Sequence, residues 1–167
     1  MEVVFNQKLQ DTMSLVSKAV DINKKFKVDM WVVDKTGIGQ GVYDRMREMD
    51  YNVRGVSFAE KSEESQYGNL KAEWHFRLRK WIIGGGRLKH DYGWNELEIV
   101  KYKNKDGKIV IQPKEDLFRE GISSPNVVDA AVLTMAVNDT TIKSSRIFRH
   151  SQGRQFHDQT ETIWRNE

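Results

Sequence analysis

Asp34 is the first residue of this sequence whose type and position suggest chemistry. It ends an apolar, β-branched run, VDMWVVD at residues 28–34, and three glycines follow within seven residues. A carboxylate at the carboxyl end of a buried strand lies where α/β proteins form ligand sites, and it could bind a metal ion there. An aspartate in this position also often serves as a helix cap or turn residue. Both interpretations stay open for Asp34 alone.

The glycines of GIGQG, residues 37–41, suggest a loop that holds a nucleotide phosphate. A P-loop requires the pattern G-x-x-x-x-G-K-[ST], which occurs nowhere in the chain. The dinucleotide fingerprint G-x-G-x-x-G needs a glycine at position 42, which is valine. The spacing therefore favours a turn between a strand and a helix, and a nucleotide-binding α/β domain is the weakest hypothesis.

A second acid lies in the segment NVVDAAVLTMAV, residues 126–137. The segment is apolar on nearly all sides, as expected of a helix packed on a sheet, and Asp129 is its only charged residue. An unpaired buried carboxylate is costly, so Asp129 must be paired, cap the helix or bind a cation. Mg²⁺ and Mn²⁺ prefer oxygen ligands. Two aspartates 95 residues apart, one on a strand tip and one on a helix facing the sheet, could meet around such an ion.

Length and composition narrow the possible classes of protein. The chain has 167 residues, enough for one domain with a core of its own. It has no cysteine, so any metal must bind oxygen or imidazole ligands. Its net charge is +3, which is compatible with a polyanionic partner but does not require one. No segment is apolar enough to cross a membrane and no secretory signal is visible, so we expect a cytoplasmic protein with no membrane partner.

Hydrophobic periodicity predicts alternating strands and helices in the first third of the chain. We expect strands at residues 2–9, 28–34 and 52–59. Between them we expect a helix that Asp11-Thr12 caps and that runs to about residue 25, and a second helix at 41–49. This alternation favours an α/β fold with parallel strands at its centre.

The second half of the chain predicts three helices and a hairpin. Asn69 caps an amphipathic helix that ends at Gly84–Gly86, and Asp106-Gly107 forms the tight turn of a β-hairpin. Ser124 is expected to cap the last helix. The hairpin spans residues 97–112, a short helix 114–120 and the last helix 126–137, and residues 138–167 form a tail, expected to be mobile.

Three motifs in order resemble the C-terminal nuclease domain of the large terminase subunit of tailed bacteriophages. They are VVDKTGIGQGVYDRM, YGNLKAEWHFRLRKWI and IQPKEDLFREGISSPNVVDAAVLTMA, and the resemblance covers residues 1–137. It implies an RNase H-like mixed sheet flanked by helices, with a β-hairpin inserted before the last helix. It also implies a metal-dependent endonuclease that cuts concatemeric phage DNA during packaging by two-metal phosphodiester hydrolysis.

The resemblance assigns roles to individual residues. Asp34 and Asp129 take the places of catalytic acids that hold one or two Mg²⁺ or Mn²⁺ ions. Asn126 stands where the family has aspartate and is a further possible ligand. Lys114 matches a family lysine that contacts DNA or the site. Asn69, Glu73 and Trp74 also match, but are interpreted more simply as cap, ion-pair partner and core residue.

The basic interval 71–90 suggests further DNA contacts at Arg79, Arg87 and Lys89. A solvated helix face would show the same excess of positive charge, and charge alone favours that interpretation.

Two further departures from the family pattern bear on function. Lys71 replaces an arginine, a change expected to be mild on a helix surface. The family's first acid lies on the first strand of its sheet, and no acid before Asp34 replaces it. We therefore expect the nuclease domain to be N-terminally incomplete, with its first strands and the ATPase domain missing. Because a missing first carboxylate should weaken metal binding, we expect this chain alone to cleave DNA weakly or not at all.

Two functions remain as hypotheses. One is an endonuclease acting on double-stranded DNA in the cytoplasm of an infected or lysogenic bacterial host, with the terminase ATPase domain, the small terminase subunit and the portal as partners. The other is a non-catalytic DNA-binding or docking module of the packaging motor on the same fold.

Overall fold

The computed structural model describes residues 1–9 and 11–137, and the predicted tail lies outside these ranges. The elements are, in order, α1 (Thr12–Phe26), β1 (Trp31–Asp34), α2 (Gly39–Glu48), β2 (Val53–Val56), α3 (Leu70–Ile83), the 3-10 helix η1 (Tyr92–Glu98), β3 (Tyr102–Lys105), β4 (Lys108–Ile111), α4 (Lys114–Arg119), α5 (Asn126–Leu133) and the 3-10 helix η2 (Thr134–Ala136). No helix within the described ranges is long and apolar enough to cross a membrane.

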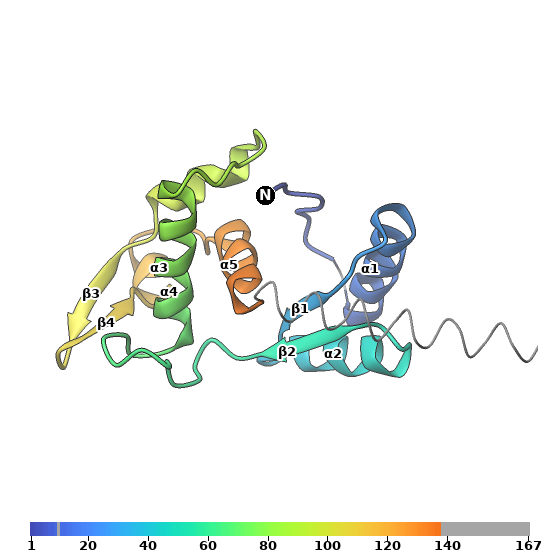
Figure 1. Ribbon diagram of the computed structural model, residues 1–167, viewed down its shortest axis with the longest axis horizontal. Helices are drawn as coiled ribbons and strands as arrows, with labels where there is room; N and C mark the ends of the chain where they lie inside the picture. Colours follow the sequence, from blue (N-terminus) through green and yellow to red (C-terminus); the bar gives the residue numbers. More distant parts are fainter. Residues whose placement is uncertain (10, 138–167) are drawn as a thin grey trace, which may run out of the picture.

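The strands form two small sheets instead of one continuous mixed sheet. β1 and β2 are parallel, with Trp31 opposite Val53, and β3 and β4 form an antiparallel hairpin. Figure 1 shows the hairpin at one end of the molecule and α1 and α2 at the other. The prediction of an α/β fold with central parallel strands and a hairpin before the last helix is confirmed, and the single mixed sheet is corrected to two sheets.

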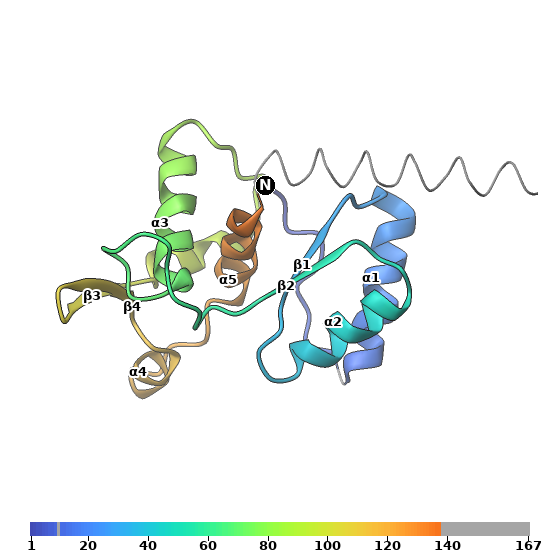
Figure 2. The same cartoon turned by 60° about the horizontal axis from the view of Figure 1, so that its bottom comes forward.

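The β1–β2 sheet separates two hydrophobic clusters because its side chains alternate between its faces. Trp31 and Val33 point toward α1 and α2, whose buried residues are Val16, Ala19, Val42 and Met46. Val32 and Val56 point toward the cluster formed by α3 and α5. α1 and α2 thus lie on one side of the sheet and α5 on the other, in both ribbon views (Figures 1 and 2).

Local capping explains where α1 and α3 begin. The Asp11 carboxylate accepts a hydrogen bond from Ser14 N at 2.8 Å, and the Asn69 side chain accepts one from Ala72 N at 3.0 Å. Each side chain satisfies a backbone donor that the first turn of a helix leaves free. Both caps were predicted from the sequence and are confirmed.

The two other family positions on α3 have the simpler roles predicted for them. Trp74 is 3% exposed within the core of α3 and α5. Glu73 is fully buried, forms an ion pair with Arg77 and accepts a hydrogen bond from Ser62 Oγ at 2.6 Å. Glu73 therefore holds the loop before α3 against the helix.

The start of α5 differs from the prediction. Ser124 does not cap it, and its hydroxyl is buried without a hydrogen-bond partner. Instead, the Glu96 carboxylate in η1 accepts hydrogen bonds from Val127 N at 2.7 Å and Val128 N at 3.1 Å. An acid at this position also complements the helix dipole. A residue 31 positions away therefore replaces the local cap.

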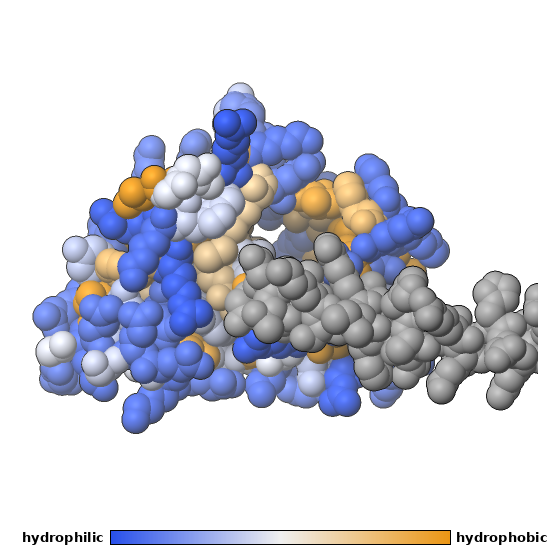
Figure 3. Space-filling model, viewed as in Figure 1, coloured by the Kyte–Doolittle hydropathy of each residue, from blue (hydrophilic) through white to orange (hydrophobic). Residues whose placement is uncertain are grey.

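The predicted strand at residues 2–9 is absent from the described structure. The chain here is irregular, with its first residue tied to the loop after α3: the Met1 amino group donates to Arg87 O, and Lys89 N donates to Met1 O. β-branched residues form a strand only where a partner edge is available. Residues 1–6 instead form one wall of a cleft of about 550 Å³ that faces α5, and Figure 3 shows the molecule hollowed between its two halves.

Candidate functional site

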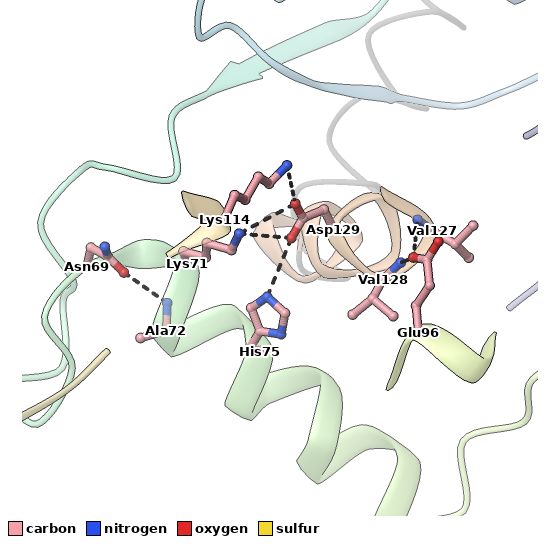
Figure 4. A network of polar contacts seen from close by, with 9 residues as sticks. All are labelled: Asn69, Lys71, Ala72, His75, Glu96, Lys114, Val127, Val128 and Asp129. Atoms are coloured by element: carbon pink, nitrogen blue, oxygen red, sulfur yellow. Dashed lines mark hydrogen bonds and ion pairs between the residues drawn. The ribbon is translucent and has the colours of Figure 1, made fainter. Parts of the chain in front are cut away.

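Asp129 lies at the meeting point of three cationic or ionisable side chains. It is 7% exposed, and Lys114 Nζ is 2.9 Å from its Oδ2 atom. Lys71 Nζ is 3.1 Å and His75 Nε2 3.7 Å from its Oδ1 atom. Figure 4 shows all three side chains directed at this one carboxylate. Of the three roles predicted for Asp129, the structure shows pairing, and its partners are side chains of the protein itself.

Secondary structure explains why these side chains converge. Lys71 and His75 are four residues apart on α3 and therefore share one face of that helix. Lys114 is the first residue of α4 and directly follows Pro113. Proline has no backbone N–H group, so it fits immediately before a helix but not inside one. α3 and α4 thereby approach the first turn of α5, where Asp129 lies.

The surroundings of Asp129 keep its carboxyl group ionised. Burial on its own would raise the pKa of this group, since a low dielectric disfavours charge. His75, Lys71 and Lys114 act in the opposite direction and hold the pKa of Asp129 well below its usual value. The group is a carboxylate at neutral pH, which is the form that binds cations.

Asp34 occupies a more open position. It is partly exposed at the end of β1, and its Oδ1 atom accepts a hydrogen bond from Thr36 N at 3.0 Å. This contact is the turn role that the sequence left open. Within the described part of the chain, Oδ1 is the Asp34 carboxylate oxygen that accepts a hydrogen bond, and Oδ2 accepts none.

The two aspartates lie toward the same end of the β1–β2 sheet. Asp34 points to the same face as Val32, the face that packs on α5.

Arg54 of β2 donates to Ala136 O, just beyond the carboxyl end of α5. Farther along the chain, Phe58 O accepts from Lys71 N, beside Asp129 at the amino end of α5. β2 therefore runs from the carboxyl end of α5 toward its amino end. No hydrogen bond or ion pair among the described residues joins the two carboxylates.

The structure does not bring the remaining candidate metal ligand to Asp129. Asn126 is exposed and lines the 550 Å³ cleft beside Val127 and Ala130, whereas Asp129 lines a different, smaller one with Lys71 and Lys114. Three residues separate Asn126 from Asp129 on a helix whose turn is 3.6 residues, yet the two side chains serve different clefts.

The predicted DNA-contacting residues are distributed over the surface. Arg79 and Arg87 are exposed, and Lys89 is also exposed but forms an ion pair with Glu2 at 2.7 Å. Lys114 is the only one of the four that contacts Asp129. Its side chain is 40% exposed, so it also reaches solvent.

Two residues of the site, Lys71 and His75, were not predicted from the sequence. Lys71 was assigned to the helix surface, but its side chain is only 17% exposed and contacts Asp129. His75 was not considered, although it is buried. Their spacing of four residues on a capped helix was the available signal, together with the need of Asp129 for cationic partners.

The side chains of this site offer oxygen atoms that suit a hard divalent cation, but they offer few of them. Asp34 and Asp129 supply carboxylate oxygens, which Mg²⁺ and Mn²⁺ prefer. No group of three or more histidine, aspartate or glutamate side chains that could hold a metal is found within residues 1–9 and 11–137. A bound ion would share Asp129 with Lys71 and Lys114.

Comparison with solved structures assigns the architecture. A mutant nuclease domain of the large terminase subunit gp2 of bacterial virus Sf6, solved with manganese and beta-thujaplicinol, superposes with a TM-score of 0.61. The fold is that of a terminase nuclease domain. The match covers 78% of this chain and 74% of the Sf6 domain at 18% sequence identity, so the likeness to the terminase nuclease domain establishes the fold alone. No family model and no curated protein sequence matches the chain.

Proposed function

We propose that this chain is the DNA-cleaving domain of a packaging terminase and that Asp34 and Asp129 are its acidic metal ligands. The observation that carries the proposal is the position of Asp129: it is buried, ionised and located toward the same end of the sheet as Asp34. The terminase nuclease fold supports the same function. Double-stranded DNA is the proposed substrate, and the other subunits of a packaging motor are the proposed partners.

Each residue of the site has a distinct task in this function. His75 and Lys71 orient the Asp129 carboxylate from α3, and Lys71 compensates its charge. Lys114 lies on the exposed side of the same carboxylate, where its ammonium group could bind a backbone phosphate. Asp34 supplies its second oxygen from the strand tip. A divalent ion held by the two carboxylates would supply an activated water and stabilise charge on the phosphate.

A non-catalytic DNA-binding module is the second candidate. It is favoured by one observation: Lys71 and Lys114 already compensate the charge of Asp129 within the protein. In that case the carboxylate would serve as a structural ion-pair partner, and metal ions would change neither DNA binding nor DNA integrity.

Cleavage of supercoiled plasmid by the full chain in Mn²⁺ or Mg²⁺ distinguishes these functions. We expect weak cleavage to nicked and linear products, because the first acid of the family is missing, and we expect this cleavage to disappear with Asp34→Asn, which removes one charge from a partly exposed side chain. Asp129→Asn should have the same effect. The matched control is Asp44→Asn, which neutralises an exposed acid on α2. It should cleave like the parent chain.

The outcome is decided by cleavage and folding measured together. Thermal unfolding followed by circular dichroism separates loss of activity from loss of structure, mainly for the buried Asp129. Equal cleavage by the parent chain and Asp34→Asn would falsify the assignment. Intact DNA binding without cleavage in either metal would support the non-catalytic module instead.

A further inference from the structure

The β3–β4 hairpin is rich in lysine. Residues 101–108, KYKNKDGK, contain four lysines and one aspartate, a net charge of +3. All four residues of β3 are exposed. The hairpin projects from the body as an arm at the end opposite α1 (Figure 1), and Figure 3 shows mostly hydrophilic residues on this end.

The lysines share one face of the hairpin. Side chains alternate along a strand, so residues 101, 103 and 105 point to one side and Tyr102 to the other. The Tyr102 ring packs edge-on against Phe76 of α3, with ring centroids 5.3 Å apart. Lys108 pairs with Lys105 across the strands and therefore joins the lysine face. One face of the hairpin is held by the protein, and the other presents a row of ammonium groups.

Two of the four lysines are left without an acidic partner. Lys101 and Lys103, near the base, form ion pairs with Glu120 and Asp116, both at 3.3 Å. No ion pair in the described part of the chain involves Lys105 or Lys108. These two lie directly opposite each other in the antiparallel register, an arrangement that destabilises a hairpin because like charges repel. The tip thus has an uncompensated repulsion that an anionic ligand would relieve.

The base of the hairpin lies beside Asp129. Lys101 and Gln112 line the same small cleft as Asp129, Lys71 and Lys114. From this cleft the lysine row runs outward along β3, whose four residues at roughly 3.3 Å each extend it by about 13 Å. A polyanion bound at Asp129 and Lys114 can therefore continue along the hairpin.

We propose that the lysine face of the β3–β4 hairpin binds the phosphate backbone of duplex DNA and holds it beside Asp129. This inference rests on the proposed function, because the hairpin is assigned the same substrate. The contacts are electrostatic and independent of base sequence, since exposed lysines bind phosphates as point charges. The tip pair Lys105 and Lys108 contributes the free ammonium groups.

Binding of a 30-base-pair duplex by the full chain tests the arm, by fluorescence anisotropy in EDTA over a series of KCl concentrations. We expect Lys105→Gln with Lys108→Gln to weaken binding about ten-fold at roughly 0.1 M salt and to lower the slope of log Kd against log salt by up to about 2. The matched control, Lys24→Gln with Lys25→Gln at the end of α1, removes the same charge from the opposite end and should bind like the parent chain.

Because binding is measured without metal, every outcome tests DNA binding by the hairpin independently of catalysis. A tip variant that binds with the same Kd and salt slope as the control would overturn the proposal, as would a parent chain that does not bind the duplex at low salt. Lysines on an exposed strand can instead serve to block edge-to-edge pairing. Self-association of the tip variant on size-exclusion chromatography with unchanged DNA binding would establish that role and reject the arm. A tip effect without plasmid cleavage would retain the arm and reject the nuclease.

Discussion

Lys71 and Asp129 lie 58 residues apart in the chain, yet the Lys71 ammonium nitrogen is 3.1 Å from a carboxylate oxygen of Asp129. This contact joins the first turn of α3 to the first turn of α5. Both side chains are largely buried, at 17% and 10% exposed, so the pair is screened little by solvent. It is the central contact of the proposed site.

Replacing Lys71 with methionine should destabilise the protein while preserving most of its packing. Lys114 and His75 would still face Asp129, so we expect a loss of about 1–3 kcal/mol in the free energy of unfolding, measured by urea denaturation. Lys80→Met, which replaces an exposed lysine of the same helix, is the control and should change stability by less than about 0.5 kcal/mol. Equal stability of both variants would mean that the Lys71 contact contributes nothing.

Asp129 should make stability depend on acid pH. Its pKa is lowered in the folded state, so its charge stabilises the fold at pH values above the unfolded-state pKa of about 3.9. This contribution falls as the pH drops through the folded-state value. The parent chain should therefore be more stable than Asp129→Asn at pH 7, with a difference that shrinks below about pH 4. Urea titrations of both chains from pH 7 to pH 3 measure this difference, and a gap that stays constant would contradict the ion-pair role.

Glu96 should be required for the stability of α5. Its carboxylate accepts from two backbone N–H groups of the first turn, so Glu96→Ala leaves both donors without this partner. We expect a cost of about 1–2 kcal/mol, in the range of a lost helix cap. Glu98→Ala, an exposed acid at the end of the same 3-10 helix, is the matched control. Thermal unfolding of the two variants should separate them clearly, and coincident curves would show that Ser124 or water can replace Glu96.

The glycine turn offers a paired test at two of its positions. A Cβ atom on Gly39 would lie 1.8 Å from the Asp34 carbonyl oxygen, so Gly39→Ala must displace the turn that carries Asp34. A Cβ atom on Gly41 would only contact Thr12 Cγ2 at 3.4 Å. We expect Gly39→Ala to cost about 2–4 kcal/mol as a backbone clash, and Gly41→Ala to be neutral or stabilising by up to about 1 kcal/mol through helix propensity. Urea denaturation measures both, and equal effects would contradict the close packing of the turn on Asp34.

The helix positions and the hairpin turn were predictable because their causes act over a few residues. Asp11 and Asn69 cap the helices that directly follow them, and Asp106-Gly107 forms the hairpin turn, with both residues at positive φ. Among these local predictions, the cap at Ser124 was wrong: Glu96, which lies in η1, accepts the hydrogen bond from Val127 N in its place. A local preference holds only where no tertiary partner satisfies the same backbone donors better.

The strand expected at residues 2–9 failed for a related reason. A strand needs a neighbouring edge for its backbone hydrogen bonds, and Met1, directly before this segment, bonds to the loop after α3 instead. Residue type indicated an extended segment but could not supply its partner. The division of the strands into two sheets was hidden from the sequence in the same way.

By itself the sequence determined that Asp34 ends an apolar strand beside a turn and that Asp129, the only charge on an apolar helix, must be paired, cap the helix or bind a cation. Those conclusions follow from periodicity and from the cost of burying a charge. Only the tertiary structure decided that the partners are Lys71, His75 and Lys114, because α3, α4 and α5 meet through packing between segments far apart in the chain. It also turned the lysines of the hairpin into one face, since strand register, and not spacing alone, sets Lys108 opposite Lys105.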